Sequence, residues 1–409
     1  DATRMNAPKP LSKWTPASPV EPTAPWTSAG CSAGGATLFV STHQALLTLG
    51  AAASGDGCVS RVSNSFGHYY GAAPVAALQA AGAGSTRALL VGSQGRLSRP
   101  RRAARRSLAA RRPSPRNASA APPGLQDALL LLDPEARSVL GWWALPTVYL
   151  HDSVLSGSDL FSVDTDSGRV LRFRVSAGTA AAPMPPSALP LSEGGWAAVE
   201  HVRSYESSGA PRAAHANGLT LGLGRLWVMH NNLASRSAVQ LVDAASGALG
   251  ARLPLGGANC HSPLFYRGRL LYLLSASGGL GRLHPNGTSD TLWAAGARYF
   301  SKGLAVVDDI AYLAVALRQR AAVERNFAAS EVAAFDLLRH VLLWRRPLPF
   351  PGLVNSLTAP RVGPGCLWRA CATGAAGEAA ESLHAPREAE WAAALRAGPT
   401  QGGLFGALG

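Results

Sequence analysis

From about Thr37 onward, short apolar runs of four to eight residues alternate with Gly, Asp, Ser or Pro. Examples are Leu129–Leu132, Leu160–Val163 and Leu226–Met229. Such runs between turn signals are typical of buried strands, and the gaps between them leave little room for helices. One exception is Glu378–Arg396, where the spacing of Leu383, Trp391, Ala394 and Leu395 predicts a short amphipathic helix. The pattern therefore predicts an all-β protein.

The strands recur as a repeated unit of four. Each unit opens with a polar residue, often His, which is followed by an apolar strand, a turn and three further strands. The clearest copy opens at His215 and continues through Arg225–Met229 and Val239–Asp243. Openings lie at His68, His151, His215, His261, Lys302 and Asn355. Four-stranded units of about 40–50 residues are the blades of β-propellers, so six openings predict a six-bladed β-propeller with four-stranded blades.

The sixth unit is incomplete at its C-terminal end, whereas Thr37–Phe66 contains strands that have no opening of their own. We expect these N-terminal strands to close the last blade, because closure removes two exposed strand edges. The predicted organisation is a mobile leader over residues 1–36 and a propeller over 37–373. A tail with a short helix follows over 374–409.

One turn carries a resemblance to a known family. The stretch Leu160–Leu171, with Asp164, Gly168 and Arg169 around its turn, resembles the second-to-third-strand turn of NHL repeats. The array over residues 37–373 is similar in architecture to the six-bladed NHL and SMP-30-like propellers. Within that group, peptidyl-hydroxyglycine amidating lyases hold a central metal with histidines from different blades, whereas SMP-30-like lactonases use carboxylates and asparagines. The resemblance implies the first arrangement more than the second, although no longer motif is shared.

The formal net charge of +14 comes mostly from one segment. Nine arginines and no acidic residue lie between Gln94 and Gln126, and without them the charge is +5. We expect the insertion over residues 96–124 to be disordered, because its Pro, Ser, Ala and Arg composition cannot bury a core. It is either a basic arm for an acidic partner or an unselected insertion. No aromatic residue interleaves the arginines to stack on bases, so we expect no specific nucleic-acid partner.

Other features limit the class of protein. Five cysteines with no CxxC spacing argue against a cysteine-held zinc site. No apolar stretch is long enough to predict a membrane span. Asn117 and Asn286 begin glycosylation sequons, which predict a glycoprotein if the chain enters the secretory route. We favour that route as an expectation for localisation.

The blade openings carry the candidate chemistry. The first strand of a propeller blade lines the central channel, so residues at its entry converge on the axis. His68, His151, His215 and His261 could together hold a divalent metal such as Zn, Fe or Cu, because neutral imidazole donates a lone pair. The same histidines could instead hydrogen-bond the backbone of neighbouring blades.

Further polar residues near the openings are candidate ligand-binding groups. Asp152 and Asn217 could orient the histidines or add oxygen ligands. Lys302 could bind an anion, or act as an acid–base group if its pKa is lowered, although channel lysines often pair with carboxylates. Asn355 opens the last blade, and Tyr69 could stack on a ligand or pack in the core. The sequence thus predicts a channel site for a small molecule or peptide. The alternative is a non-catalytic scaffold that presents one face to a protein partner.

Overall fold

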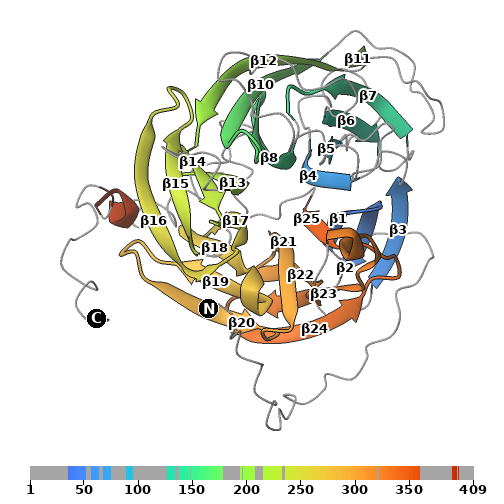
Figure 1. The fold of residues 1–409 in the computed structure, drawn as a ribbon. Coiled ribbons are helices and arrows are strands. Elements are labelled where there is room, and N and C mark those ends of the chain that lie inside the picture. Colours follow the sequence, from blue (N-terminus) through green and yellow to red (C-terminus); the bar gives the residue numbers. More distant parts are fainter. Residues whose placement is uncertain are drawn as a thin grey trace, which may run out of the picture.

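The structure of the protein is a computed structural model. It describes residues 36–51, 57–63, 68–74, 89–94, 127–133, 138–147, 149–177, 194–195, 197–207, 215–232, 235–319, 322–359, 389–393 and 395. Within these ranges, six antiparallel sheets surround a central axis (Figure 1). Residues 1–35 of the predicted leader, the basic insertion over 96–124 and most of the tail lie outside the described residues, whereas Ala36 begins the first strand.

Each sheet is formed by strands that are consecutive in the chain, apart from the closing blade and one short added strand. The first blade contains β4 (His68–Pro74), β5 (Leu89–Gln94), β6 (Ala128–Asp133) and β7 (Ser138–Ala144). The second contains β8 (Leu150–Ser156), β9 (Asp159–Asp164), β10 (Arg169–Ala177) and β12 (Ala197–Glu206). The third contains β13 (Ala216–Gly222), β14 (Arg225–His230), β15 (Arg236–Asp243) and β16 (Leu249–Ala258).

The remaining blades continue the same order. The fourth contains β17 (His261–Tyr266), β18 (Arg269–Leu274), β19 (Gly279–Leu283) and β20 (Ser289–Ala294). The fifth contains β21 (Tyr299–Val307), β22 (Ile310–Leu317), β23 (Ser330–Asp336) and β24 (Val341–Pro347). The sixth combines β25 (Val354–Thr358) with β1 (Ala36–Thr42), β2 (Leu46–Ala51) and β3 (Gly57–Ser63).

The innermost strands form a closed ring. In the order β4, β8, β13, β17, β21 and β25, each contacts the next, and β25 contacts β4 again. These strands stand around the centre of the molecule (Figure 1). Five of them begin at or next to a residue that the sequence identified as a blade opening, and β21 begins at Tyr299, three residues before the predicted opening Lys302. The predicted six-bladed β-propeller is therefore confirmed.

The ring closes between the two ends of the repeat array. Strand β25 pairs antiparallel with β1, with Phe39 opposite Thr358 and Ser41 opposite Ser356. Three N-terminal strands and one C-terminal strand thus share one sheet, as predicted from the incomplete sixth unit. Because the last strand of the repeat array pairs with the first, the ring is closed and neither end of the array leaves an open sheet edge between blades.

Apolar side chains fill the spaces between neighbouring blades. Between the fifth and sixth blades, for example, Leu38, Val40, Tyr312 and Trp344 are all almost fully buried in one cluster. The short apolar runs of the sequence supply these residues, because every central strand contacts a blade on each face. This packing fixes the positions of the innermost strands and therefore the shape of the channel.

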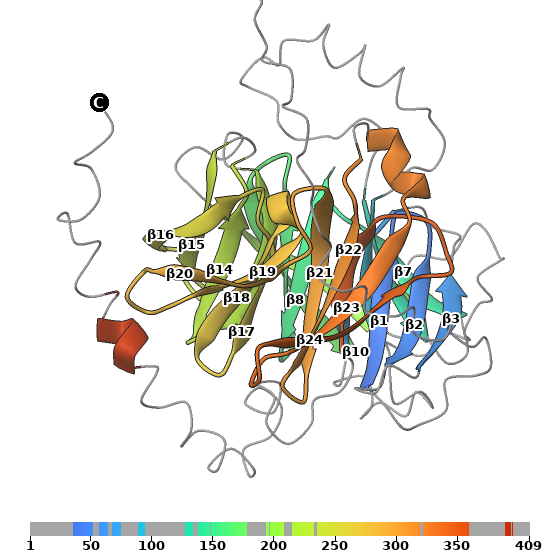
Figure 2. The same cartoon turned by 90° about the horizontal axis from the view of Figure 1, so that it is seen from below.

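The structure adds details to the predicted pattern. A two-residue strand, β11 (Gly194–Gly195), pairs with the outer strand β7, so the first blade has a fifth strand. Two 3-10 helices occur, η2 (Ser275–Ser277) and η3 (Ala322–Phe327), and η3 stands in orange on one face of the ring in Figure 2. None of the described helices is both long and apolar enough to cross a membrane.

Part of the predicted C-terminal helix is present. Residues 389–393 are helical, and Trp391 is fully buried. Its ring meets that of Trp227 at 5.0 Å between centroids, and its Nε1 donates a hydrogen bond to the Gly268 carbonyl at 2.7 Å. The Trp at the centre of the predicted amphipathic pattern therefore anchors this segment to the third and fourth blades.

Candidate functional site

Every innermost strand is interrupted by a β-bulge near its start. In β4, β8 and β13 the pairing skips one residue, which is Gly71, His151 and Asn217 respectively. In β25 it skips Asn355. In β17 and β21 the irregularity covers Ser262–Pro263 and Lys302–Gly303. An extra residue in one strand bends the chain and changes the direction of a side chain, and bulges are frequent beside active sites.

The bulges place three predicted site residues near one point. Lys302 crosses the channel from β21, and its Nζ lies 3.5 Å from Nε2 of His151 on β8. The same Nζ donates a hydrogen bond to Oδ1 of Asn355 at 3.2 Å and lies 4.7 Å from the centroid of the Tyr70 ring. Asn355 in turn donates through Nδ2 to the Tyr69 carbonyl at 2.8 Å. Four blades therefore contribute to the surroundings of one amine.

Three of the four predicted histidines converge beside this amine. The His151 ring lies 6.1 Å from that of His215 and 5.9 Å from that of His261, measured between centroids. They do not occupy equivalent positions, however, because His151 is on the bulge, His261 is paired before it and His215 precedes β13. His68 opens β4, but its side chain lies outside the described residues.

Burial favours the neutral forms of these groups. Burial is the main cause that lowers the pKa of Lys302 to about 7, and the positive charge of Arg325 acts in the same direction. Burial also lowers the pKa of His151 and of His261 well below the usual range, and the Lys302 charge adds to this effect. For His215, burial and the same charge lower the pKa to about 4. Three neutral imidazoles therefore surround an amine that titrates near neutral pH.

Two of the rings differ in their hydrogen bonds. Nδ1 of His261 lies 2.9 Å from the Asn259 carbonyl oxygen, which can only accept, so Nδ1 carries the proton. Nδ1 of His151 is buried and has no hydrogen-bond partner among the described residues. Asn217 donates to the Cys260 carbonyl at 3.0 Å, and its own Oδ1 is likewise buried without a partner. The site therefore keeps unused polar atoms next to the channel.

Asp152 adds an acid to the same channel. Its Oδ2 accepts from the Leu219 backbone N–H at 3.2 Å, and its Oδ1 accepts from that of Ser153 at 2.9 Å. Burial raises the pKa of Asp152 to about 7, although these two hydrogen bonds and the Lys302 charge oppose the rise. The pKa values of Asp152 and Lys302 are therefore shifted in opposite directions, and both come to about 7. Opposite pKa shifts of this kind prepare acid–base pairs in many active sites.

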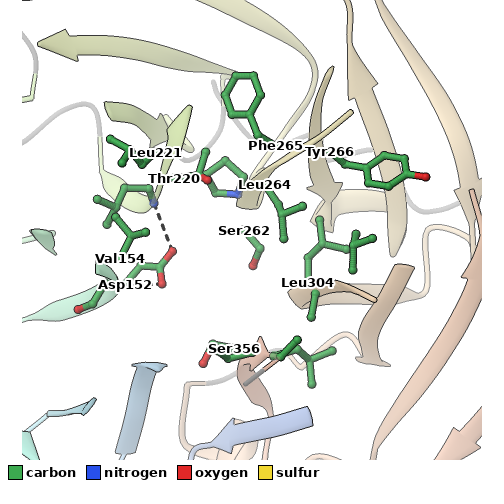
Figure 3. Close-up of a pocket in the computed structure, with 18 of the residues that line it drawn as sticks. Asp152, Val154, Thr220, Leu221, Ser262, Leu264, Phe265, Tyr266, Leu304 and Ser356 are labelled. Atoms are coloured by element: carbon green, nitrogen blue, oxygen red, sulfur yellow. Dashed lines mark hydrogen bonds between the residues drawn. The ribbon is translucent and has the colours of Figure 1, made fainter. Parts of the chain in front are cut away.

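Five of the bulged strands, all but β4, line a cavity of about 410 Å³. Its lining includes His151, Asp152, Lys302 and Asn355, together with apolar side chains farther along the innermost strands. Figure 3 shows Asp152, Ser262, Leu304 and Ser356 around the same space, each from a different innermost strand. The cavity thus combines a few polar groups with apolar walls, as small-molecule sites commonly do.

The structure separates the two adjacent tyrosines. Tyr69, for which the sequence left stacking on a ligand and core packing open, is fully buried in a core cluster with Phe39 and Leu46, and its backbone carbonyl reaches the site. Tyr70 carries the aromatic face instead, beneath the Lys302 amine. The sequence analysis also missed His43, whose Nε2 lies 3.5 Å from the Tyr70 hydroxyl. His43 lies in the β1–β2 connection, where no blade-opening pattern marks it.

The predicted histidine-held metal stays a prediction, because the side chain of His68 is not among those described. Among the described side chains, no group of three His, Cys, Asp or Glu residues could hold a metal ion. The position beside His151 Nε2 is taken by the Lys302 amine, which when protonated would repel a metal cation. We therefore derive no chemical step through a metal.

Comparisons with known proteins give no family. No protein-family model matches the chain, and no curated protein sequence matches it. A chain of a nidogen/laminin complex superimposes with a TM-score of 0.48 and 10% identity, over 80% of this chain and 99% of that one. A putative 6-phosphogluconolactonase from Bacteroides uniformis gives 0.41 and 10%, over 77% and 83%.

A glutaminyl cyclase from Myxococcus xanthus gives a TM-score of 0.31 and 12% identity, over 46% of this chain and 78% of that one. These similarities are too low to carry an argument about activity. The propeller assignment rests on the six sheets and their closed ring.

Proposed function

We propose that the central channel binds a small organic molecule, or the end of a peptide, and that Lys302 and Asp152 exchange protons with it near neutral pH. The observation that carries this proposal is the Lys302 amine, which is buried at the axis and lines a cavity of about 410 Å³. Within the described part of the chain it forms no ion pair with a carboxylate, and the charge of Asp152, which acts to raise its pKa, does not outweigh the effect of burial.

Membership of the NHL and SMP-30-like group belongs to this proposal. Its support is architectural: six blades whose innermost strands present histidine, asparagine and a carboxylate toward one channel. The chemistry that these residues favour is general acid–base catalysis. A neutral Lys302 accepts a proton, and a protonated Asp152 donates one. Tyr70 and Asn355 would hold the amine in place between these steps.

Binding is tested by filling the cavity. Val154 lines it and is only partly buried, so Val154→Phe should narrow the space without opening the core. Val341 is 45% exposed on the outer strand β24, and Val341→Phe is the matched control. Saturation-transfer NMR with acetate, propylamine and benzyl alcohol should show binding to the wild type and to Val341→Phe, and a several-fold loss in Val154→Phe.

Two results would contradict the proposal. Equal signals from the two variants would place binding outside the channel, and no binding of any probe to the wild type would favour the alternative, a scaffold for a protein partner. Elemental analysis of the purified protein provides an independent check. Stoichiometric zinc, iron or copper that is lost in His151→Ala and His261→Ala would favour the metal interpretation over the amine site.

A further inference from the structure

Lysine is rare in this chain, and one of the few lysines lies in the central channel of the propeller. Only three of the 38 basic side chains are lysines, namely Lys9, Lys13 and Lys302. Lys302 is therefore the single lysine of the propeller, and its side chain is only 6% exposed. Arginine remains protonated at every physiological pH, whereas a buried lysine can lose its proton and become a nucleophile.

The contacts of Lys302 suit a neutral amine. A neutral amine has two N–H groups and one lone pair. One N–H donates to Asn355 Oδ1, and the lone pair can accept from His151 if Nε2 carries that ring's proton. The Tyr70 ring, whose centroid lies 4.7 Å from Nζ, can receive the remaining N–H. No acidic oxygen lies within 4 Å of Nζ among the described residues, so none of these contacts requires the charge.

From this geometry we infer that Lys302 forms a reversible imine with an aldehyde or ketone bound in the channel cavity. The inference rests on the proposed function, since it needs the cavity to admit a small molecule. The Lys302 lone pair attacks the carbonyl carbon, and the carbonyl oxygen takes up a proton to give a carbinolamine. Loss of the nitrogen proton and of the hydroxyl as water then gives the C=N bond. Amine and carbonyl are thus converted to imine and water, with no change in oxidation state.

Asp152 supplies the acid for the dehydration step. A hydroxyl leaves a carbinolamine readily only when it is protonated, and Asp152 lines the same cavity as Lys302. Its carboxyl is held by the backbone N–H groups of Leu219 and Ser153. In the neutral range it can donate a proton to the departing hydroxyl and recover it from solvent or from the amine.

The walls of the cavity define the class of carbonyl compound. Four leucines line the cavity, each on a different innermost strand and each farther along its strand than the polar residues near the bulges. They are Leu219, Leu264, Leu304 and Leu357. Figure 3 shows Leu264 and Leu304 on the same side of this space. These walls fit an aldehyde or ketone with an apolar body, whose carbonyl group reaches the amine while its hydrocarbon part contacts the leucines.

The experiment is reductive trapping with benzaldehyde and cyanoborohydride at neutral pH. The reductant converts an imine to a stable secondary amine, so Lys302 should gain one benzyl group, detected by peptide mass spectrometry. Lys9 and Lys13 of the same chain are the internal controls, and Lys302 should be modified at least about tenfold faster than either. Lys302→Arg should remove the fast modification and leave the slow modification of Lys9 and Lys13.

A second variant separates reactivity from structure. Asn355→Asp keeps the size of the side chain but places a carboxylate about where the amide oxygen lies 3.2 Å from Nζ. The new charge stabilises the protonated amine and raises its pKa. Trapping at neutral pH should therefore fall, and it should recover as the pH is raised. A purely structural role for Lys302 would leave this pH profile unchanged.

Binding of benzyl alcohol, which has the same ring but no carbonyl group, distinguishes two kinds of failure. If benzyl alcohol binds in the channel but Lys302 is trapped no faster than Lys9 or Lys13, the imine is overturned and the binding site stands. If the alcohol also fails to bind, the proposed function is overturned as well. Fast trapping at Lys302 that Val154→Phe suppresses supports both.

Discussion

The Lys302 amine meets the His151 imidazole across the full width of the channel. The two atoms are 3.5 Å apart, although the residues are 151 positions apart in the chain. Their strands, β21 and β8, are separated by two innermost strands in either direction around the ring. A single side chain therefore bridges opposite blades. Because the amine is held at the axis by contacts from several blades, its protonation should affect both folding and binding.

Lys302 should link folding to pH above neutrality. Its pKa is lowered from 10.5 to about 7 in the folded protein, so between these values the unfolded chain holds a proton that the folded chain lacks. The contribution of Lys302 to the free energy of unfolding therefore rises with pH through this window. Lys302→Met should remove that rise, so the variant should be most stable relative to wild type below about pH 7. Urea unfolding across the window measures the difference.

The contribution of Asp152 to the free energy of unfolding should change with pH in the opposite direction to that of Lys302. Its pKa is raised from 3.8 to about 7, so between these values the folded chain holds a proton that the unfolded chain has lost. The contribution of Asp152 to the free energy of unfolding falls as the pH rises through this range. Asp152→Asn should remove the fall. If the free energy of unfolding of Asp152→Asn differs from that of wild type by an amount that stays constant with pH, then burial does not raise the pKa of this carboxyl.

Ring closure should be essential for stability. A chain that begins after Phe66 would lack β1, β2 and β3. Strand β25 would then lose its pairing partner, and the face of the fifth blade that packs against the sixth would be exposed. We expect such a chain to lose cooperative thermal unfolding, since a large part of one interblade core is absent. A transition that remains cooperative at an unchanged temperature would contradict the importance of the closing sheet.

Trp391 should fasten the C-terminal segment to the propeller. Trp391→Ala removes a fully buried ring from its contacts with Trp227 and Phe265. Loss of a buried aromatic side chain typically costs about 3–5 kcal/mol, and we expect the lower end because the segment can detach. Trp391→Phe is the matched control, since it keeps a smaller aromatic ring but lacks the N–H that bonds to Gly268. Equal stability of both variants and wild type in chemical denaturation would show that the segment is not anchored.

Deletion of residues 96–124 should leave the propeller folded. The flanking strands β5 and β6 pair directly, with Leu89 opposite Leu132, so the deletion shortens a connection within one blade. It also removes nine arginines, and retention on heparin should fall strongly because that attraction depends on net charge and salt. Unchanged retention would assign the basic surface to the propeller, and a lower melting temperature would assign the segment a role in folding.

The fold was predictable from sequence because its signals repeat. Each blade contributes a polar opening, short apolar runs and turn residues, so errors in one blade are corrected by the others. The incomplete sixth unit also predicted the closure between β25 and β1. The two-residue strand β11 is an addition to one blade, so the repeated pattern could not predict it.

The site was only partly predictable, because bulges change which side chains face the channel. Simple alternation along β4 gives no reason to choose Tyr70 over Tyr69, and a shift of one residue exchanges the two faces of a strand. Lys302 was identified from its place in the repeat, and its possible acid–base role followed from its chemistry. Its surroundings are supplied by three other blades, and no local pattern in the chain records them.

The closing strand also determines when the site can exist during synthesis. Asn355, which accepts from Lys302 and donates to the Tyr69 carbonyl, lies on the last of the described propeller strands to leave the ribosome. Until β25 inserts between β1 on one side and the innermost strands on the other, the amine lacks its oxygen acceptor and the channel wall has a gap. Incomplete chains that end before this strand lack the Asn355 acceptor of the amine, so we expect the proposed chemistry to be absent from nascent and prematurely terminated products.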